Sequence, residues 1–342
     1  MKLLKAKFLL LAAFLCLAAI AGLGYYYFLT DFTEGKDATS YVCVDEDDTL
    51  DSVLTKLRPY ATEHSLTGFS TLIRHTGYAK KPVTGRYAIE PGMTTWQLMR
   101  KMRNGQQTPL MLTIPEVRTM QKLAGTLSKK LMLDSVEIAA ALIDEPYCER
   151  WGYDTATIAA LFVPNTYQVY WDVTLDHFMD RMTKEHDVFW NAQRQQKAKD
   201  AGLTPNEVAT LASIIDEETA NTAEKPMIAG MYINRLRAGM PLQADPTVKF
   251  ALKNFELRRI YHDMLFLDNP YNTYRNTGLP PGPIKVASVK GIDAVLDYVK
   301  HDYLYMCAKE DFSGTHNFAK SYSEHLRNAA RYAKALNERG IK

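Results

Sequence analysis

The first long feature of the chain is an apolar run without a charge from Phe8 to Leu29. A helix needs about 20 such residues to cross the hydrocarbon core of a bilayer, so the run predicts a transmembrane helix over residues 8–29. Lysines occupy positions 2, 5 and 7, whereas mostly acidic residues follow the run. By the positive-inside rule we expect residues 1–7 in the cytoplasm and everything after Thr30 outside it.

A cleaved secretory signal is the alternative, because residues 19–21 (Ala-Ile-Ala) have the small-x-small pattern of a cleavage site. The apolar run continues beyond them to Leu29, however, whereas the core of such a signal is normally about 7 to 15 residues long. Both interpretations place the body of the protein outside the cytoplasm.

Shorter patterns follow a polar tether over residues 30–40. Alternating apolar positions predict strands at 42–44 and 83–89, and helical spacing predicts helices at 50–57, 69–75 and 94–105. Two strands that flank two helices outline a small carbohydrate-binding module over residues 41–107, and a plain spacer domain is the alternative.

The apolar segment 110–115 predicts a buried strand that begins a larger unit over residues 108–342. Helical patterns follow at 119–131, 135–142, 154–161 and 173–198. The expected fold class is therefore α+β, with a transmembrane helix, a small module and a larger mixed α/β domain.

The segment from Thr204 carries a strong helix-start signal, with a capping residue, Pro205 at the first helical position and Glu207 three residues after the cap. Apolar residues between 208 and 215 share one face and end at three acids. On the helical wheel Glu217 points almost opposite the apolar stripe and Glu218 lies nearest to it. Partial burial raises a carboxyl pKa, so Glu218 is the candidate general acid. A solvated acidic face is the alternative.

A second helix is predicted from a cap at Asn221 to Gly239, and polar and aromatic residues then crowd into loops stiffened by proline and glycine. Tyrosine faces stack on sugar rings and planar amides hydrogen-bond to hydroxyl groups. The candidate substrate-binding residues are Asn234, Arg235, Gln243, Asp245, Thr247, Tyr271, Asn272, Tyr274 and His316.

The amino-acid composition excludes several classes of protein. Hydrophobic residues make up 46% of the 342 residues, which excludes a disordered chain, and the net charge of +2 gives no basic field for nucleic acid. The four cysteines are scattered without a CxxC pair, so neither a metal site nor a cofactor is predicted. Outside the cytoplasm Cys43, Cys148 and Cys307 could include one disulfide, and the sequence does not select the pair.

Several motifs closely resemble the YceG-like family, the endolytic murein transglycosylases called MltG. They are LASIIDEETA (211–220), INRLRAGMPLQADPTV (233–248), NPYNTY (269–274), GLPPGPI (278–284), YLYM (303–306) and His-Asn-Phe (316–318). The resemblance implies a single membrane span, a LysM-like module and a catalytic domain. The family's catalytic glutamate, which precedes a threonine, falls on Glu218. The sequence departs from the family pattern at three positions. Asn165 stands where the family usually has an acidic residue, Val117 where it usually has glycine, and Asp216 where glutamate is commoner.

The resemblance implies cleavage of the β-1,4 bond between N-acetylmuramic acid and N-acetylglucosamine without water. Glu218 would protonate the glycosidic oxygen and then deprotonate the muramic acid C6 hydroxyl, which closes on C1 as a 1,6-anhydro sugar. Asp245, Tyr271 and Asn272 are candidates to stabilise the positive charge, His316 could contact the sugar or Glu218, and Arg235 could orient a carboxylate or form a structural ion pair.

Two alternatives remain at this stage. A muramidase would need a second carboxylate, from Asp216 or Asp245, and a binding scaffold would cleave nothing. The implied partners are peptidoglycan glycan strands and the cytoplasmic membrane. Peptidoglycan synthases are a further class of partner that the sequence does not specify. An enzyme tethered at the membrane would be suited to ending strand growth.

Overall fold

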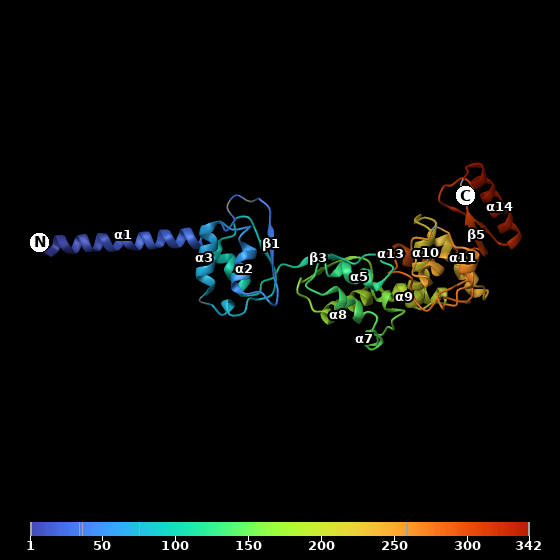
Figure 1. Ribbon diagram of the computed structural model, residues 1–342, viewed down its shortest axis with the longest axis horizontal. Helices are drawn as coiled ribbons and strands as arrows, with labels where there is room; N and C mark the ends of the chain where they lie inside the picture. The colour runs from blue at the N-terminus through green and yellow to red at the C-terminus, as the bar shows by residue number, and fades with distance from the viewer. Residues whose placement is uncertain (1, 34, 36, 75, 258, 341–342) are drawn as a thin grey trace. The chain divides into compact units, whose positions relative to one another are not determined.

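A computed structural model describes residues 2–33, 35, 37–74, 76–257 and 259–340 (Figure 1). The chain divides into two compact units. The first unit comprises residues 1–112, 130–133 and 168–173, and the second comprises residues 113–129, 134–167 and 174–342. Helices dominate both units, and the described residues form three two-stranded sheets. The mixed helix and strand content confirms the α+β class in its coarse form.

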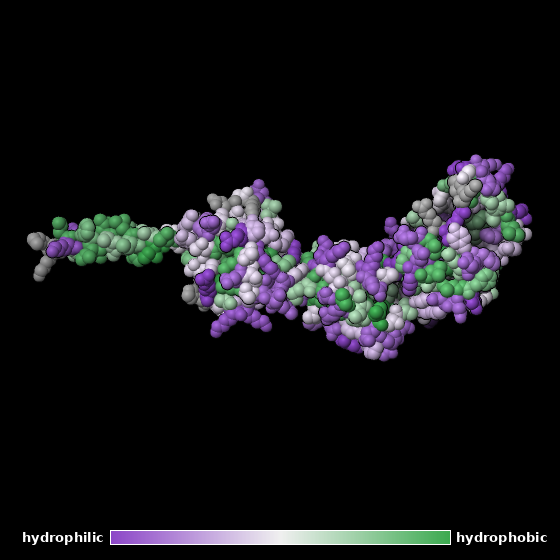
Figure 2. Space-filling model, in the orientation of Figure 1, coloured by the Kyte–Doolittle hydropathy of each residue, from purple (hydrophilic) through white to green (hydrophobic). Residues whose placement is uncertain are grey.

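The chain begins with helix α1 (Lys2–Phe28), of which Leu4–Phe28 is long and apolar enough to cross a membrane. Figure 2 shows hydrophobic residues along this helix. In its last turn the Tyr26 ring stacks on His64 of the same unit, with 4.2 Å between the ring centroids. These properties fit a single-pass membrane anchor. Glu34 and Lys36, two of the charged residues that follow the apolar run, lie outside the described residues.

The first unit contains β1 (Ser40–Val44), α2 (Leu50–Leu57), α3 (Glu63–Arg74), η1 (Gly77–Ala79), β2 (Gly85–Ile89) and α4 (Thr95–Arg103). Strands β1 and β2 pair antiparallel, with Val42 opposite Tyr87. The predicted helix 69–75 began too late, because Thr62 accepts a hydrogen bond from the backbone N–H of Ser65 and so caps an earlier turn. His75 lies outside the described residues.

The second unit and its connections contain the remaining elements. These are β3 (Leu110–Thr113), α5 (Met120–Leu127), α6 (Ser135–Ala141), α7 (Glu145–Glu149), η2 (Ile158–Leu161), β4 (Thr166–Val169), α8 (Leu175–Phe189), α9 (Ala192–Ala201), α10 (Pro205–Glu218), α11 (Lys225–Arg237), α12 (Asp245–Ala251), η3 (His262–Phe266), α13 (Val289–Leu296), β5 (Tyr305–Ala308), β6 (His316–Ala319) and α14 (Tyr322–Glu338). Strand β3 pairs with β4, and β5 pairs with β6.

Three helix predictions were wrong in detail. The segment 173–198 forms two helices, because the chain leaves the helical conformation at Trp190 and Asn191 caps α9 by accepting from the N–H of Arg194. The segment 154–161 contains only the short 3-10 turn η2. Helix α11 begins at Lys225 without a side-chain cap, and the Asn221 side chain accepts from the N–H of Ala223 instead.

Helix α10 is central to the core of the second unit. Its predicted capping box is confirmed, since the Thr204 hydroxyl accepts from the N–H of Glu207 and the Glu207 carboxylate accepts from the N–H of Thr204. Every residue from Val208 to Ile215 is buried, so the helix is covered on all sides rather than along one stripe. Helices α11 and α13 pack against it. The three acids at its end are therefore held on a rigid element.

Candidate active site

Glu218 is the last residue of helix α10 and the last of the three acids there. Its carboxyl Oε1 accepts a hydrogen bond of 2.9 Å from the Tyr232 hydroxyl. The pKa of Glu218 is raised to about 7, chiefly because the carboxyl is buried. The Tyr232 hydrogen bond and the charge of Lys249 lower the pKa, and the charge of Asp245 adds to the rise. The partial burial predicted for Glu218 is therefore present, and the group can hold or release a proton near neutral pH.

Tyr232 contacts Glu218 and was not among the residues that the sequence predicted for the site. It lies on α11 with 1% of its surface exposed. Burial and the adjacent Glu218 raise its pKa well above the usual value, so its hydroxyl keeps its proton and donates to the carboxyl. A tyrosine two residues before the Asn234-Arg235 pair was visible in the sequence, but only the packing of α11 on α10 directs it at Glu218.

The contacts of Asp216 hold helices together rather than facing open space. Its side chain is 2% exposed and forms an ion pair with Lys225. It also accepts hydrogen bonds from the backbone N–H of Ser288 over 2.7 Å and from the Ser288 hydroxyl over 2.8 Å. These contacts join the end of α10 to the starts of α11 and α13. They leave Asp216 poorly suited to act as the second carboxylate of a muramidase.

Glu217 was predicted to be solvated, and this prediction was wrong. Its side chain is 16% exposed, because Arg118 and Lys285 cover it. Oε2 accepts from Arg118 Nη2 over 2.6 Å, and Oε1 lies 3.3 Å from Lys285 Nζ. Burial alone would raise the pKa of Glu217, but these two cations outweigh it and hold the pKa below its usual value. Glu217 is therefore a charged carboxylate at neutral pH, whereas Glu218 can hold or release a proton there.

Asp245 and Tyr274 meet at the start of α12. The Tyr274 hydroxyl donates to Asp245 Oδ1 over 2.6 Å, and burial together with the charges of Asp245 and Glu218 raises the Tyr274 pKa. Asp245 is exposed, so a ligand can reach it. The negative charge of Asp245 raises the pKa of Glu218, so the two carboxyl groups influence each other.

Four of the predicted substrate-binding residues use their polar groups to hold the backbone. Arg235 donates to the backbone carbonyl groups of Pro241, Leu242 and Leu304, and Asn234 donates to those of His301 and Tyr303. Asn272 donates to the carbonyl groups of Leu265 and Leu267, and Thr247 donates to that of Ala244. Arg235 is 7% exposed, and Thr247 and Asn272 are fully buried. We therefore treat these residues as the scaffold of the site.

Gln243 is exposed, and Tyr271 and His316 are half-buried. The Gln243 amide oxygen accepts from Arg235 Nη1 over 3.2 Å, and the Tyr271 ring packs on Phe250 with 4.7 Å between centroids. His316 contacts Glu224 rather than Glu218. Its backbone N–H donates to one Glu224 oxygen over 2.7 Å, and its Nδ1 lies 2.9 Å from the other.

A cavity of about 670 Å³ opens in the same unit, lined by basic and aromatic side chains that include Arg118, Lys253, Lys285, Phe250 and Tyr271. A small hollow beside it is lined by Glu217 and Lys249. The end of α10 is therefore flanked by open space.

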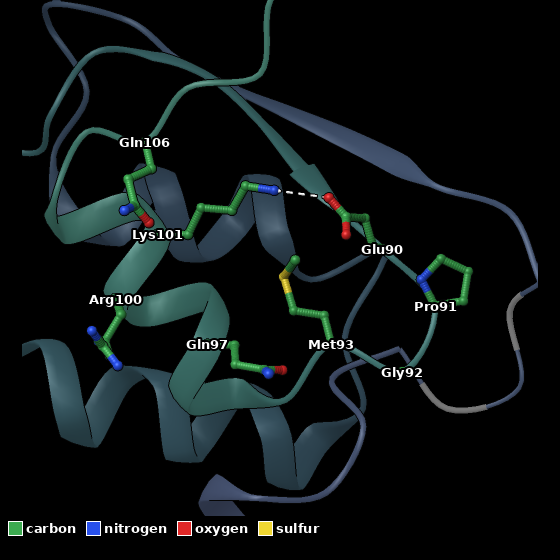
Figure 3. Close-up of a pocket in the computed structure, with 8 residues that line it drawn as sticks. All are labelled: Glu90, Pro91, Gly92, Met93, Gln97, Arg100, Lys101 and Gln106. Atoms are coloured by element: carbon green, nitrogen blue, oxygen red, sulfur yellow. Dashed lines mark hydrogen bonds and ion pairs between the residues drawn. The ribbon is translucent and has the colours of Figure 1, made fainter.

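Another hollow, of about 510 Å³, lies in the first unit between β2 and α4 (Figure 3). Its acid, Glu90, is 57% exposed and lies 3.1 Å from Lys101 Nζ, the contact drawn in Figure 3. A solvated, paired carboxylate is a poor general acid, which favours Glu218 as the reacting group.

The described residues place no three His, Cys, Asp or Glu side chains where they could share a metal ion. All four cysteines are free thiols, so none of the pairs left open above is joined.

The chain resembles known proteins over most of its length. The sequence model of the YceG-like family matches residues 42–331. The endolytic murein transglycosylase of Bacillus subtilis (strain 168) is 30% identical over 75% of this chain and 74% of its own length. The enzyme of the same name from Streptococcus pneumoniae (strain D39) is 27% identical over 96% of this chain and 65% of its own length.

A solved structure extends the likeness to the fold. The crystal structure of a yceG-like protein from Listeria monocytogenes has a TM-score of 0.54 and 26% sequence identity, and the match covers 85% of this chain and 99% of that chain. Since the family model spans most of the sequence and the relatives align over most of it, the chain belongs to the YceG-like family.

Proposed function

We propose that the protein is an endolytic lytic transglycosylase that cleaves the MurNAc-β-1,4-GlcNAc bond of peptidoglycan and leaves 1,6-anhydro-MurNAc ends. The observation that carries this proposal is Glu218, a carboxyl whose pKa of about 7 suits both proton donation and proton removal. Relatives that align over most of the chain bear the name endolytic murein transglycosylase.

The reaction needs one carboxyl in two protonation states. Protonated Glu218 donates to the glycosidic oxygen as the bond to C1 breaks. The resulting carboxylate, stabilised by the Tyr232 hydroxyl and the charge of Lys249, accepts the proton of the C6 hydroxyl as that oxygen bonds to C1. The proton count balances, and no water enters. Asp245, held by Tyr274, is the negative group best placed to stabilise the oxocarbenium-like state.

A hydrolase that cleaves the same bond is the rival function, because Asp245 could serve as its second carboxylate. The two functions differ in the product. Mass spectrometry of purified strands digested by the enzyme should give fragments with anhydro ends. Fragments heavier by one water would show a muramidase, and intact strands would show a scaffold that only binds.

A LysM-like carbohydrate-binding role for residues 41–107 is part of the proposal, with residues 108–342 as the catalytic domain. The order β1, α2, α3, β2 and the antiparallel pairing of the two strands support it. Cosedimentation of the full-length Glu218→Gln variant with insoluble peptidoglycan tests binding apart from cleavage. Release of the variant by soluble glycan fragments is the expected result.

We also propose that α1 anchors the enzyme in the cytoplasmic membrane with the N-terminus inside and the catalytic domain outside. Lysines before the apolar run support this orientation. Added protease should digest the C-terminal domain in spheroplasts without lysis, and a soluble chain that starts near Gly22 would contradict the anchor. Such an enzyme would end the growth of nascent strands made by peptidoglycan synthases, so its loss should lengthen glycan strands.

A further inference from the structure

We propose that the cavity lined by Arg118, Lys253, Lys285, Phe250, Phe255 and Tyr271, here called the basic pocket, binds a carboxylate on the peptide branch of the murein strand. The inference rests on the proposed function and extends it to the part of the substrate that selects a cleavage site.

The basic pocket brings together three cations that are far apart in the sequence. Arg118 precedes α5, Lys253 follows α12, and Lys285 lies before α13. The Lys253 ammonium lies 3.5 Å from the centroid of the Phe250 ring, and the Arg118 guanidinium lies 5.3 Å from that of Phe255. Aromatic rings therefore form an apolar wall beneath charged groups, which suits a ligand with both carboxylates and aliphatic segments.

The three cations of the basic pocket differ in their partners. Glu217 contacts Arg118 and Lys285, and Glu116 lies 3.5 Å from Lys285 Nζ. Among the described residues Lys253 forms no ion pair, and it is exposed, so a ligand can reach it. Partial burial against its neighbours lowers its pKa. Arg118 and Lys285 therefore have carboxylate partners, whereas the Lys253 ammonium contacts the Phe250 ring. A ligand carboxylate would supply the missing partner.

The pocket is connected to the reacting acid through short stretches of chain. Glu217, which contacts two of its cations, directly precedes Glu218. Phe250 follows Lys249, whose charge acts on Glu218. A strand bound with its scissile bond at Glu218 would carry a peptide branch on the muramic acid at that bond, next to the basic pocket. Arg235, the earlier candidate for a carboxylate partner, is committed to backbone carbonyls.

The test compares two substrates with three enzymes. The substrates are glycan strands that carry uncrosslinked peptides and the same strands after an amidase has removed the peptides. The enzymes are wild type, Lys253→Gln and a control, Lys184→Gln, which changes an exposed lysine on α8 in the same unit. The measured quantity is the preference, defined as kcat/KM for peptide-bearing strands divided by kcat/KM for bare strands.

We expect Lys253→Gln to lower the preference about fivefold to tenfold, through KM, as is typical when one charge-assisted contact is lost. Lys184→Gln should leave the preference within twofold of wild type. Lys253 has a φ of 52°, a conformation in which lysine and glutamine are similarly strained, so thermal melting should be unchanged.

A modified substrate isolates the carboxylate. Conversion of the peptide carboxylates to amides should lower the preference of the wild type by the same factor and leave that of Lys253→Gln unchanged. An unchanged preference in Lys253→Gln, or an equal loss in both enzymes on amidation, would overturn the pocket assignment. Failure of the wild type to form anhydro ends from either substrate would contradict the proposed function instead.

Discussion

The Tyr232 hydroxyl donates a hydrogen bond of 2.9 Å to Oε1 of Glu218, across the packed surfaces of α11 and α10. Tyr232 is buried and keeps its proton, so it acts on the carboxyl only as a donor. Among the described contacts Oε2 of Glu218 accepts no hydrogen bond, which makes it the oxygen presented to the substrate. The contact therefore orients the proposed catalytic group and lowers its pKa, against the larger effect of burial.

Activity should fall as the pH rises through the pKa of Glu218. The pKa is about 7 because burial disfavours the charged form, so the proton donor is present below that pH and lost above it. We expect a basic limb near pH 7 in the profile of kcat/KM against pH. A flat profile between pH 6 and pH 8 would contradict the assignment of Glu218 as the acid.

Two substitutions should move this limb in opposite directions. Tyr232→Phe removes a hydrogen bond that lowers the pKa of Glu218, so the limb should shift to higher pH. Asp245→Asn removes a negative charge that raises it, so the limb should shift to lower pH. The same pH titration of each purified variant gives the answer. Shifts of the same sign would show that another group titrates.

Glu218→Gln should abolish cleavage, whereas Glu217→Gln should remain active but lose stability. Glutamine cannot transfer the proton, and a positioned acid or base contributes about 10² to 10⁴-fold in rate. Glu217→Gln leaves Arg118 and Lys285 short of a partner, at a cost of about 1 to 3 kcal/mol. Anhydro-product formation and urea unfolding measure the two effects. A dead Glu217→Gln with normal stability would reverse the assignment.

The Glu218→Gln variant should also change how stability depends on pH. In the wild type the pKa of Glu218 is about 7 in the folded state against 4.5 for the free group, so the unfolded chain loses this proton first. This contribution to stability is full at low pH and is lost as the pH rises through 7. Relative to wild type, the variant should therefore gain stability between pH 5 and pH 8, as measured by thermal melting.

Asp216→Asn should destabilise the protein more than any single change at Glu217. Its carboxylate is buried with Lys225 and Ser288, and removal of one member of a buried ion pair costs about 3 to 5 kcal/mol. Urea unfolding at neutral pH measures the loss. If Asp216→Asn instead folds normally and yields no product, Asp216 has a catalytic role and the muramidase alternative regains a candidate.

Glu224 should act through His316. Glu224→Gln and His316→Gln should each raise KM, because the carboxylate orients the ring. In the double variant the combined effect should match the larger single effect, since both changes disturb one unit. Steady-state kinetics on peptide-bearing strands gives all four values of the cycle. Fully additive effects would show that Glu224 does not position His316.

The sequence by itself determined the local features of the site. Residues Thr204, Pro205 and Glu207 started α10 where the capping signals placed it, because a cap depends only on neighbours in the chain. The wheel placed Glu218 nearest the apolar stripe, and in the structure burial raises its pKa. The wheel did not reveal that the Asp216 side chain is also buried, at 2% exposed. The apolar run likewise predicted α1, since helix length and composition are local properties.

Tertiary structure alone decided which groups those acids meet. Arg118 and Glu217 are 99 residues apart, and no helical wheel could reveal that a distant arginine covers the face predicted to be solvated. Tyr232 and the basic pocket depend in the same way on how separate elements pack. Capping and periodicity are set by residues a few positions apart, whereas pKa values and binding pockets depend on charges and surfaces that only the fold brings together.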